Sequence, residues 1–240
     1  MTSSMTNPDY IHSLSSISSV RAEHAFEQKQ PSRLYRGAKR TFDLAVGLLA
    51  LMLATPFLIC AAVAIAATSS GPVFFRQERV GYRGRTFRIW KLRTMYANTD
   101  DSEHRAYVRA MFTEDRPLEG GRNGLHKLDD HRVTPVGRLL RRASIDELPQ
   151  LFNVLRGEMS LVGPRPALAW EVELFGPSED LRCQVKPGIT GLWQVSGRSR
   201  LTMREALDLD CTYAQKPSLL LDLKILLKTI PVVFARRDTA

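Results

Sequence analysis

An uncharged stretch of 32 residues, from Leu44 to Phe75, constrains the fold of this chain more than any other feature of its sequence. Its first 24 residues, LAVGLLALMLATPFLICAAVAIAA, are almost all apolar. A helix rises about 1.5 Å per residue, so this segment is long enough to cross a hydrocarbon core of about 30 Å. Forty-three residues precede the stretch, and we therefore do not expect a cleaved signal peptide. The sequence predicts a membrane-inserted helix.

Two features indicate that this helix enters the membrane and returns to the same side. Thr55 and Pro56 lie near its middle, where the proline removes a backbone hydrogen bond and the threonine hydroxyl can bond to a freed carbonyl. Both flanks are also basic, and the positive-inside rule places both in the cytoplasm. The flanking cations are Arg33, Arg36, Lys39 and Arg40 before the stretch and Arg76, Arg79, Arg83, Arg85 and Arg88 after it. We expect a re-entrant, helix-break-helix segment over residues 33–75, with a straight transmembrane helix as the alternative.

Positive charge is concentrated around this stretch. From Arg33 to Arg93 there are eleven Lys or Arg against two acidic residues, an excess equal to the formal net charge of +9 of the whole chain. Such a segment indicates anionic partners, which are lipid head groups, nucleic acid or phosphorylated substrates. The three cysteines are far apart and lack CxxC spacing, which argues against a disulfide framework and a thiolate zinc site. We therefore expect a reducing compartment.

The chain divides into three predicted segments. Residues 1–32 are rich in Ser, Gln and Thr without a period, and we expect a disordered tail. The membrane segment covers residues 33–75. We expect residues 76–240 to form a cytoplasmic domain with a helix-rich α+β fold and a small β-hairpin. Within it, the polar residues 99–130 contain EGGRNG and predict a surface loop.

Residues 79–95, RVGYRGRTFRIWKLRTM, predict two short strands joined by a turn that contains glycine. Side chains alternate along a strand, so Lys91 and Arg93 share one face, where two cations could bind an anion. A solvated edge strand protected by its charges explains the same pattern.

Two adjacent carboxylates, Asp146 and Glu147, lie shortly after Arg141 and Arg142, at the expected start of a helix. Pro149 is tolerated only in the first turn of a helix, so the helix should begin near the two carboxylates. Its apolar positions and the glycine after its end are Leu148, Leu151, Phe152, Leu155 and Gly157. Acidic residues at a helix N-terminus usually act as caps. Whether this pair does more depends on what surrounds it.

Two further segments form rigid basic loops. GPRP, residues 163–166, fixes the backbone on both sides of Arg165, as bidentate recognition of phosphate would require. KPGITGLWQVSGRS, residues 186–199, combines three glycines with Trp193 and Arg198. Trp193 either stacks on a base or sugar or is a buried structural residue.

The segment SLLLDLKILLKTIPVVFARR, residues 218–237, predicts an amphipathic helix. Its polar side contains Asp222, Lys224, Lys228 and Thr229, and its other side is apolar. The helix is too charged to span a bilayer. It either lies at the membrane interface or packs with its apolar side on the core.

Four segments, taken in order, resemble the bacterial sugar transferases, which are monotopic polyprenyl-phosphate phosphoglycosyl transferases. They are KRTFDLAVGLLALMLATPF, FFRQERVGYRGRTFRIWKLRTM, TPVGRLLRRASIDELPQLFNVLRGEMSLVGPRP and KPGITGLWQVSGRS. The resemblance runs from about Arg33 to the C-terminus, and its motifs are long and specific. The chain is similar to the short members, because the residues before Arg33 leave no room for the multi-helix N-terminal region of larger ones. Thr55-Pro56 stands where many members have Ser-Pro and keeps the hydroxyl.

The resemblance implies that Asp146 attacks the β-phosphorus of a nucleotide diphosphate sugar and carries the phosphosugar until polyprenyl phosphate accepts it. Glu147 would act as a base or, with Asp146, as a ligand of the catalytic Mg²⁺. A nucleophilic carboxylate must be ionised, and we expect Arg141 and Arg142 to favour the ionised form. The candidate residues for binding phosphate or the nucleotide sugar are Lys91, Arg93, Arg141, Arg165 and Arg198.

The expected partners are a UDP-sugar donor, polyprenyl phosphate and the lipids of the bacterial inner membrane, with the catalytic domain in the cytoplasm. The reaction would be the first membrane step of exopolysaccharide, capsule or O-antigen synthesis. A hexose such as glucose or galactose is the expected sugar, with an acetamido sugar as the alternative. We expect no nucleic acid as a partner and leave self-association into a homo-oligomer open.

The competing hypothesis is a non-enzymatic protein that is anchored to the membrane and binds anionic lipid or nucleic acid through its basic surface. It explains the basic segment equally well. It gives no purpose to the Asp146–Glu147 pair or to the two loops.

Overall fold

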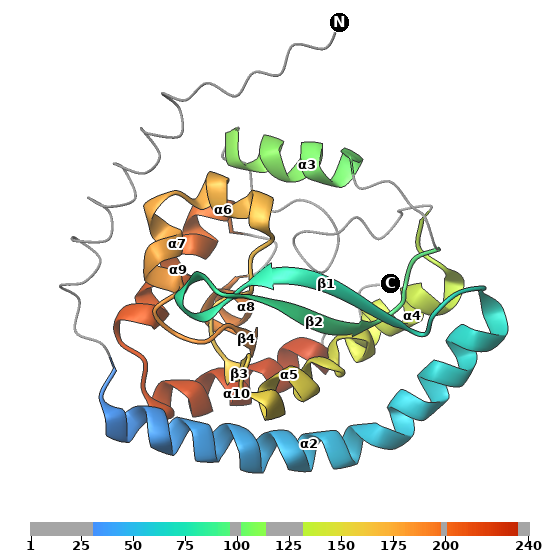
Figure 1. Ribbon diagram of the computed structural model, residues 1–240, viewed down its shortest axis with the longest axis horizontal. Helices are drawn as coiled ribbons and strands as arrows, with labels where there is room; N and C mark the ends of the chain where they lie inside the picture. Colours follow the sequence, from blue (N-terminus) through green and yellow to red (C-terminus); the bar gives the residue numbers. More distant parts are fainter. Residues whose placement is uncertain (1–30, 97–101, 114–131, 198–200, 235–240) are drawn as a thin grey trace, which may run out of the picture. The chain divides into compact units, whose positions relative to one another are not determined.

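The computed structural model describes residues 31–96, 102–113, 132–197 and 201–234 (Figure 1). The helices in these residues are α2 (Arg33–Thr68), α3 (Ser102–Thr113), α4 (Pro135–Ala143), α5 (Gln150–Arg156), α6 (Ala169–Phe175), α7 (Pro177–Arg182), α8 (Leu192–Ser196), α9 (Met203–Gln215) and α10 (Leu219–Phe234). The strands are β1 (Phe74–Val80), β2 (Thr86–Leu92), β3 (Ser160–Val162) and β4 (Gly188–Thr190), and two 3₁₀ turns are η1 (Tyr82–Gly84) and η2 (Ile145–Glu147). The predicted helix-rich α+β class is confirmed. The boundaries of the three predicted segments stay predictions, and residues 1–30 of the expected tail lie outside the described residues.

The apolar stretch lies in α2, a continuous helix of 36 residues. The predicted break is wrong, because the helix continues through Pro56. Its axis nevertheless bends, and Figure 1 shows the cyan part of α2 turning away from the blue part, as expected where a proline cannot donate to the carbonyl of Met52. The Thr55 hydroxyl donates to the Leu51 carbonyl at 2.8 Å. It therefore does not bond to the carbonyl that the proline frees.

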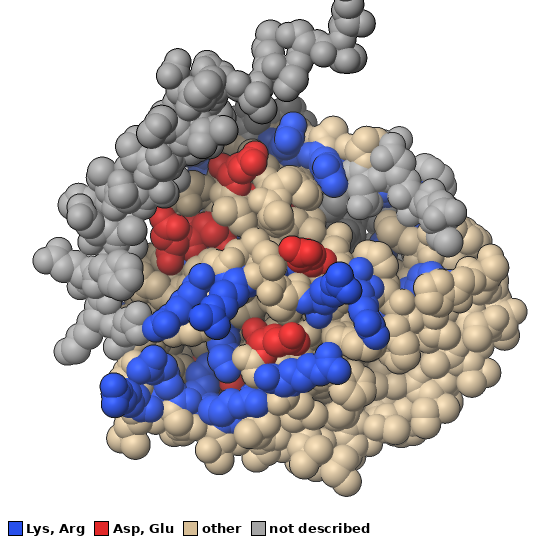
Figure 2. All heavy atoms as spheres, in the orientation of Figure 1, with Lys and Arg blue, Asp and Glu red and all other residues tan. Residues whose placement is uncertain are grey.

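Among the described helices, α2 alone is long and apolar enough to cross a membrane. Only 17% of its most apolar window of 18 residues is buried inside the protein. Its exposed apolar side chains include Leu48, Leu49, Met52, Leu53, Phe57, Ile59 and Val63. In Figure 2 the surface over the C-terminal part of α2, at lower right, shows no charged side chain. Such a surface is unfavourable in water and is suited to lipid.

The predicted hairpin is confirmed. Strands β1 and β2 pair antiparallel from Phe74 opposite Leu92 to Val80 opposite Thr86. At the far end of β1, the Val80 amide donates to the Ala167 carbonyl at 2.8 Å, directly after the GPRP loop. The hairpin therefore joins the end of α2 to the loop that carries Arg165.

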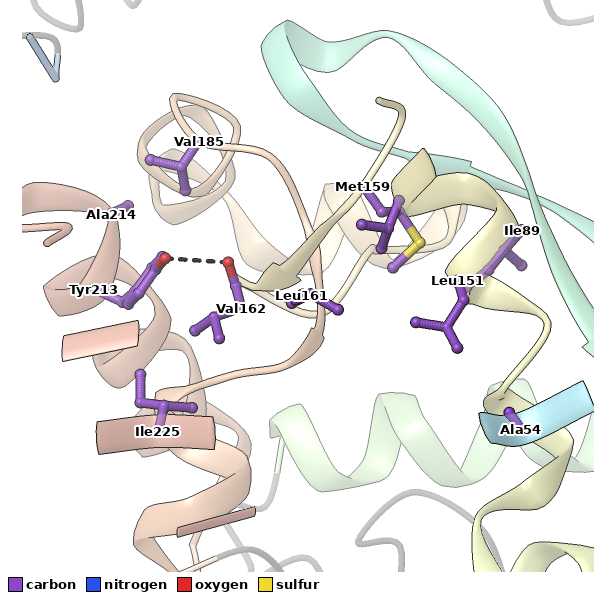
Figure 3. Close-up of a cluster of buried hydrophobic side chains, with 11 residues drawn as sticks. Ala54, Ile89, Leu151, Met159, Leu161, Val162, Val185, Tyr213, Ala214 and Ile225 are labelled. Atoms are coloured by element: carbon purple, nitrogen blue, oxygen red, sulfur yellow. Dashed lines mark hydrogen bonds between the residues drawn. The ribbon is translucent and has the colours of Figure 1, made fainter. Parts of the chain in front are cut away.

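A second, two-stranded sheet lies at the centre of the main core. Strands β3 and β4 pair parallel, and the fully buried Val162 lies in β3. Figure 3 shows that side chains from α5, β3, α9 and α10, among them Leu151, Tyr213 and Ile225, meet around these strands. The Tyr213 hydroxyl lies 3.1 Å from the Val162 carbonyl and 2.6 Å from the Asp222 carboxylate, and its single proton can be donated to only one of them at a time. The short β3 is thus held from several sides, and it leads directly into the GPRP loop.

Two charged side chains of α2 reach into the rest of the protein. Arg40 donates to the carbonyls of Val154 and Leu155, at 2.6 and 2.7 Å, at the end of α5. The buried Asp43 accepts from the Ser160 hydroxyl at 3.0 Å and the Leu161 amide at 3.2 Å, both in β3. Burial of a carboxylate is costly unless hydrogen bonds of this kind compensate it. The N-terminal half of α2 is therefore packed against α5, which follows the turn with Asp146 and Glu147, and against β3, which leads into the GPRP loop.

Helix α10 packs with a polar residue inward. Asp222 is fully buried and accepts from Lys39 at 2.9 Å and from Tyr213 at 2.6 Å. The apolar side chains on the outer surface of α10 are Leu219, Leu220, Leu223, Leu227 and Ile230. The alternative that this helix packs on the core is confirmed, because Ile225 is buried and Leu221 and Leu226 pack against the same core cluster. Interfacial placement stays a prediction.

Helix α3 lies inside residues 99–130, where we predicted a surface loop. Val108 and Met111 are buried and pack in one cluster with Met203 and Ala206 of α9. The helix is mostly polar, and its few apolar residues form too narrow a stripe to be recognised in isolation. Residues 114–131 of the predicted loop lie outside the described residues.

Replacing Asp222 with Asn should lower the free energy of unfolding by about 2–4 kcal/mol, because Lys39 then loses the closer of its two described ion-pair partners, Asp222 at 2.9 Å, and is left with Asp43 at 3.8 Å. Thermal unfolding in nanodiscs checks this. The matched control is Asp208→Asn on the exposed side of α9, which should change the free energy of unfolding by less than about 0.5 kcal/mol. Equal melting temperatures for Asp222→Asn and the parent would contradict the prediction.

Candidate active site

Asp146 and Glu147 lie in η2, the 3₁₀ turn between α4 and α5. Helix α4 ends at Ser144, whose φ of 56° is left-handed and reverses the chain directly before the two carboxylates. The expectation that a helix begins at the pair is wrong, since α5 begins at Gln150. Pro149 precedes α5, and without an N–H it cannot take part in the backbone bonding of η2. The pair is thus presented by a tight turn between two helices.

The two carboxylates have different surroundings. Asp146 is buried, whereas the Glu147 side chain is 38% exposed. Lys91, near the end of β2, donates to Glu147 across 2.9 Å. The structure therefore brings Lys91 to the acidic pair, as a binding site for a charged substrate would require.

Burial, and next the Glu147 carboxylate, raise the pKa of Asp146 to about 6. Lys91 and Arg141 act in the opposite direction but do not outweigh burial. The expectation that a neighbouring arginine favours the ionised form is confirmed for Arg141, although burial has the larger effect. A carboxylate with this pKa is still mostly ionised near pH 7, and it is a stronger nucleophile than one of lower pKa.

The adjacent arginines 141 and 142 are separated by the fold. Arg141 is buried and its Nε donates to the Thr94 hydroxyl at 2.9 Å, whereas Arg142 is exposed. Helix α4 can approach Thr94 because it has a glycine at the contact, where a Cβ on Gly137 would lie 2.1 Å from the Thr94 carbonyl oxygen. Only Arg141 of the two is held beside Asp146.

Arg165 of the GPRP loop is oriented by buried charges. Its Nη1 lies 3.2 and 3.4 Å from the two carboxylate oxygens of the fully buried Glu171. The main-chain carbonyl of Arg165 accepts from Arg182, and the next carbonyl, of Pro166, accepts from Arg79 at 3.1 Å. Both the side chain and the backbone at this position are therefore fixed before any ligand arrives.

Arg79 connects this loop to the acidic pair. Burial, followed by the nearby Arg165, lowers the pKa of Arg79 to about 9, and Glu171 and Glu147 act in the opposite direction. Arg165 and Glu147 therefore both lie near enough to the Arg79 guanidinium to act on it electrostatically. Sequence reasoning missed the roles of Arg79, Glu171 and Arg182. A buried Glu171 within the apolar run LAWEVELF was the one available signal.

Three other candidates have different outcomes. Arg93 does not join Lys91 at the pair, because its Nη2 donates to the carbonyl and hydroxyl of Ser69 at 2.7 and 2.8 Å. Arg198 lies outside the described residues. Trp193 is buried in helix α8 among apolar side chains, so the structural explanation is the correct one and stacking on an exposed ligand is wrong.

The donor set of the acidic pair fits Mg²⁺. Within the described residues, no three His, Cys, Asp or Glu side chains come together as a metal site. Mg²⁺ commonly takes only one or two carboxylates and completes its shell with water and substrate phosphate oxygens. Asp146 and Glu147 can supply those two carboxylates.

Known proteins match this chain over most of its length. A sequence model described as bacterial sugar transferase matches residues 34–236. The chain is 40% identical over 204 residues to the exopolysaccharide production protein ExoY of Sinorhizobium fredii, an alignment that covers 84% of this chain and 88% of that protein. It is 43% identical over 201 residues to the UDP-glucose:undecaprenyl-phosphate glucose-1-phosphate transferase of Caulobacter vibrioides, covering 80% and 68%. It is 38% identical over 213 residues to the undecaprenyl-phosphate galactose phosphotransferase of Salmonella typhimurium, covering 87% and 42%.

Replacing Arg141 with Gln should raise the pKa of Asp146 above about 6, because the ionised carboxylate loses a stabilising cation and therefore releases its proton at higher pH. The exposed Arg142 is the matched control, and Arg142→Gln should leave the pKa near about 6. A pH titration of the carboxyl carbon by NMR, with protein labelled at Asp and treated with chelator, measures both. Equal shifts in the two variants would show that the separation of the arginines is unimportant.

Proposed function

Because the chain belongs to the bacterial sugar transferase family, we propose that it transfers a sugar-1-phosphate from a UDP-sugar to polyprenyl phosphate and releases UMP. The observation that carries the proposal is the buried Asp146 beside Glu147, with Lys91 and Arg141 held next to the pair. The Caulobacter relative is named for UDP-glucose and undecaprenyl phosphate, and the Salmonella relative for undecaprenyl phosphate and galactose. These names support the same two substrates for this chain.

Membership of this family supports an enzyme rather than a non-enzymatic binding protein. A sugar transferase acts on phosphorylated substrates, which accounts for the basic segment as well as for the acidic pair. The non-enzymatic alternative is therefore set aside.

In the proposed reaction, a carboxylate oxygen of Asp146 attacks the β-phosphorus of the UDP-sugar. A bond forms between the carboxylate and phosphorus, and the bond from phosphorus to the bridging oxygen breaks, so that UMP leaves with the bonding electrons. A phosphate oxygen of polyprenyl phosphate then attacks the same phosphorus and breaks its bond to Asp146, while Glu147 takes up any proton that this phosphate still carries. The product is polyprenyl-diphosphate-sugar, and Asp146 is regenerated as a carboxylate.

The basic side chains neutralise the phosphates during these steps. Lys91 and Arg141 lie beside the pair, and Arg165 is oriented in advance by Glu171. Phosphoryl transfer depends mainly on such positioning and on stabilisation of charge. Mg²⁺ held by Asp146 and Glu147 would supply further neutralisation of the donor phosphates.

The sugar is proposed to be a hexose. The relatives named for glucose-1-phosphate and galactose support this. The name of ExoY refers to exopolysaccharide production and supports a place at the first membrane step of such a pathway. A screen of radiolabelled UDP-sugars, acetamido sugars included, with added polyprenyl phosphate identifies the donor.

The proposed location is the inner membrane, with the catalytic residues in the cytoplasm. The exposed apolar surface of α2 supports membrane insertion, and the bend of this helix, which contains Pro56, supports a re-entrant path. A re-entrant α2 would keep both of its basic flanks on one side. The lipid phosphate would then lie at the same interface as the acidic pair.

Asp146→Asn should reduce turnover by about a thousand-fold or more while leaving the fold intact, because an amide keeps the shape of the side chain but cannot attack phosphorus. Release of UMP from UDP-sugar by protein in nanodiscs measures this. The exposed Asp180 is the control, and Asp180→Asn should retain the activity of the parent. In addition, the parent given donor alone should gain the mass of one phosphosugar. Absence of this adduct in quenched reactions would favour direct displacement over the covalent route.

Pro56→Leu should restore the missing backbone hydrogen bond, straighten α2 and move part of the population to a true span. The N-terminal tail would then reach the periplasm. A cysteine introduced as Ser4→Cys, in a background without native cysteines, reports this through an impermeant thiol reagent. In the parent sequence this cysteine should react only after permeabilisation. Labelling of it in intact cells would disprove the re-entrant path even if the catalytic assignment held.

A further inference from the structure

The guanidinium of Arg93 is buried but incompletely bonded. The residue is 7% exposed, and its Nη2 donates to the carbonyl and hydroxyl of Ser69, just after α2. Its Nε and Nη1 have no hydrogen-bond partner in the structure described here. Together these two nitrogens carry three N–H bonds. A buried cation with unused donors is unfavourable by itself and indicates that a ligand completes the site.

The surroundings of Arg93 favour an anion. Its backbone amide donates to the Val73 carbonyl, and apolar side chains of α2, β2 and α4 pack in one cluster next to it. No carboxylate among the described residues forms an ion pair with Arg93. The following residue, Thr94, accepts from Arg141, which acts electrostatically on Asp146. The unused donors of Arg93 thus belong to a residue that links the end of α2 to the flank of the catalytic turn.

We infer that Arg93 binds the terminal phosphate of the lipid acceptor. This inference rests on the proposed function and divides its anion-binding residues into two groups. Lys91 pairs with Glu147 at the carboxylates and serves the donor, whereas Arg93 is held at the end of α2, the helix with the exposed apolar surface. A phosphate attached to a polyprenyl chain approaches along that surface, and a soluble nucleotide sugar does not.

The chemistry of Arg93 suits a phosphate monoester. Arginine remains charged in apolar surroundings and offers planar, directed donors to phosphate oxygens. A phosphodiester head group has one ionisable oxygen fewer, and we expect it to bind more weakly. The apolar surroundings strengthen each of these bonds, because little water competes for the donors.

The test separates the two halves of the reaction. Arg93→Lys and Arg93→Gln are assayed in nanodiscs with donor alone, by adduct formation, and in the complete reaction, by the KM for polyprenyl phosphate. Lysine can still donate to the Ser69 carbonyl but lacks the Nε and Nη1 donors. We expect both variants to form the adduct at the rate of the parent, and the KM for the acceptor to rise about ten- to a hundred-fold while the KM for the donor stays unchanged.

The matched control is Arg88→Gln, which removes an exposed arginine of β2 and should leave both KM values unchanged. An unchanged KM for the acceptor in both Arg93 variants, or an equal loss in both halves of the reaction, would overturn the inference. If the parent itself forms no adduct, the covalent route of the proposed function fails, and the KM for the acceptor still decides the role of Arg93.

A last comparison identifies the source of the phosphate. The KM of the parent for polyprenyl phosphate is measured in nanodiscs of zwitterionic lipid and in nanodiscs with added phosphatidylglycerol. An unchanged KM supports a site for the acceptor's monoester. Competition by phosphatidylglycerol that disappears in Arg93→Gln would make this a general head-group site and would overturn the assignment to the acceptor.

Discussion

The bonds from Arg40 to the carbonyls of Val154 and Leu155 fix how α2 meets the end of α5. Carbonyls in the last turn of a helix lack partners within the helix, and a cation there also complements the helix dipole. Asp43, one turn further along α2, holds β3 in the same way. Helix α5 begins just after the acidic pair, and β3 leads into the GPRP loop. The depth of α2 in a bilayer would therefore set the height of both catalytic elements above the lipid.

Buried charge serves orientation at this site more than it serves stability. Glu171 is fully buried and holds Arg165, while Arg182 and Arg79 hold the two carbonyls of the same loop. Apolar side chains of similar volume often stabilise a protein at least as well as a buried ion pair does. An arginine that is oriented before binding, however, loses less conformational entropy when phosphate arrives. Burial of Asp146 likewise makes ionisation less favourable, and the ionised carboxylate is for this reason a stronger nucleophile.

Secondary-structure elements with a clear local pattern could be predicted from the sequence, whereas contacts between residues far apart in the chain could not. The hairpin, the membrane helix and the end of α5 at Gly157, where φ is 83°, follow from local patterns. Phe152 fits the helical period of the core positions but is 38% exposed, because the period does not say how wide the buried side is. Lys91 and Arg93 have the spacing of one strand face, yet β2 ends between them, and Arg93 turns to Ser69 instead. No pattern of neighbours in the sequence predicts that contact.

Helix α10 shows why an amphipathic pattern alone does not say which side faces the protein. Its buried positions include Asp222, while Leu220, Leu223 and Leu227 are 63%, 46% and 58% exposed. Exposure of these leucines to water is unfavourable, whereas their contact with lipid would be favourable. The ion pair from Lys39 to Asp222 joins α10 to α2, so the two apolar surfaces belong to one rigid unit. If both helices lie at the interface, as proposed, the enzyme would meet the phosphate of its lipid acceptor there. The polyprenyl chain would then not need to leave the bilayer.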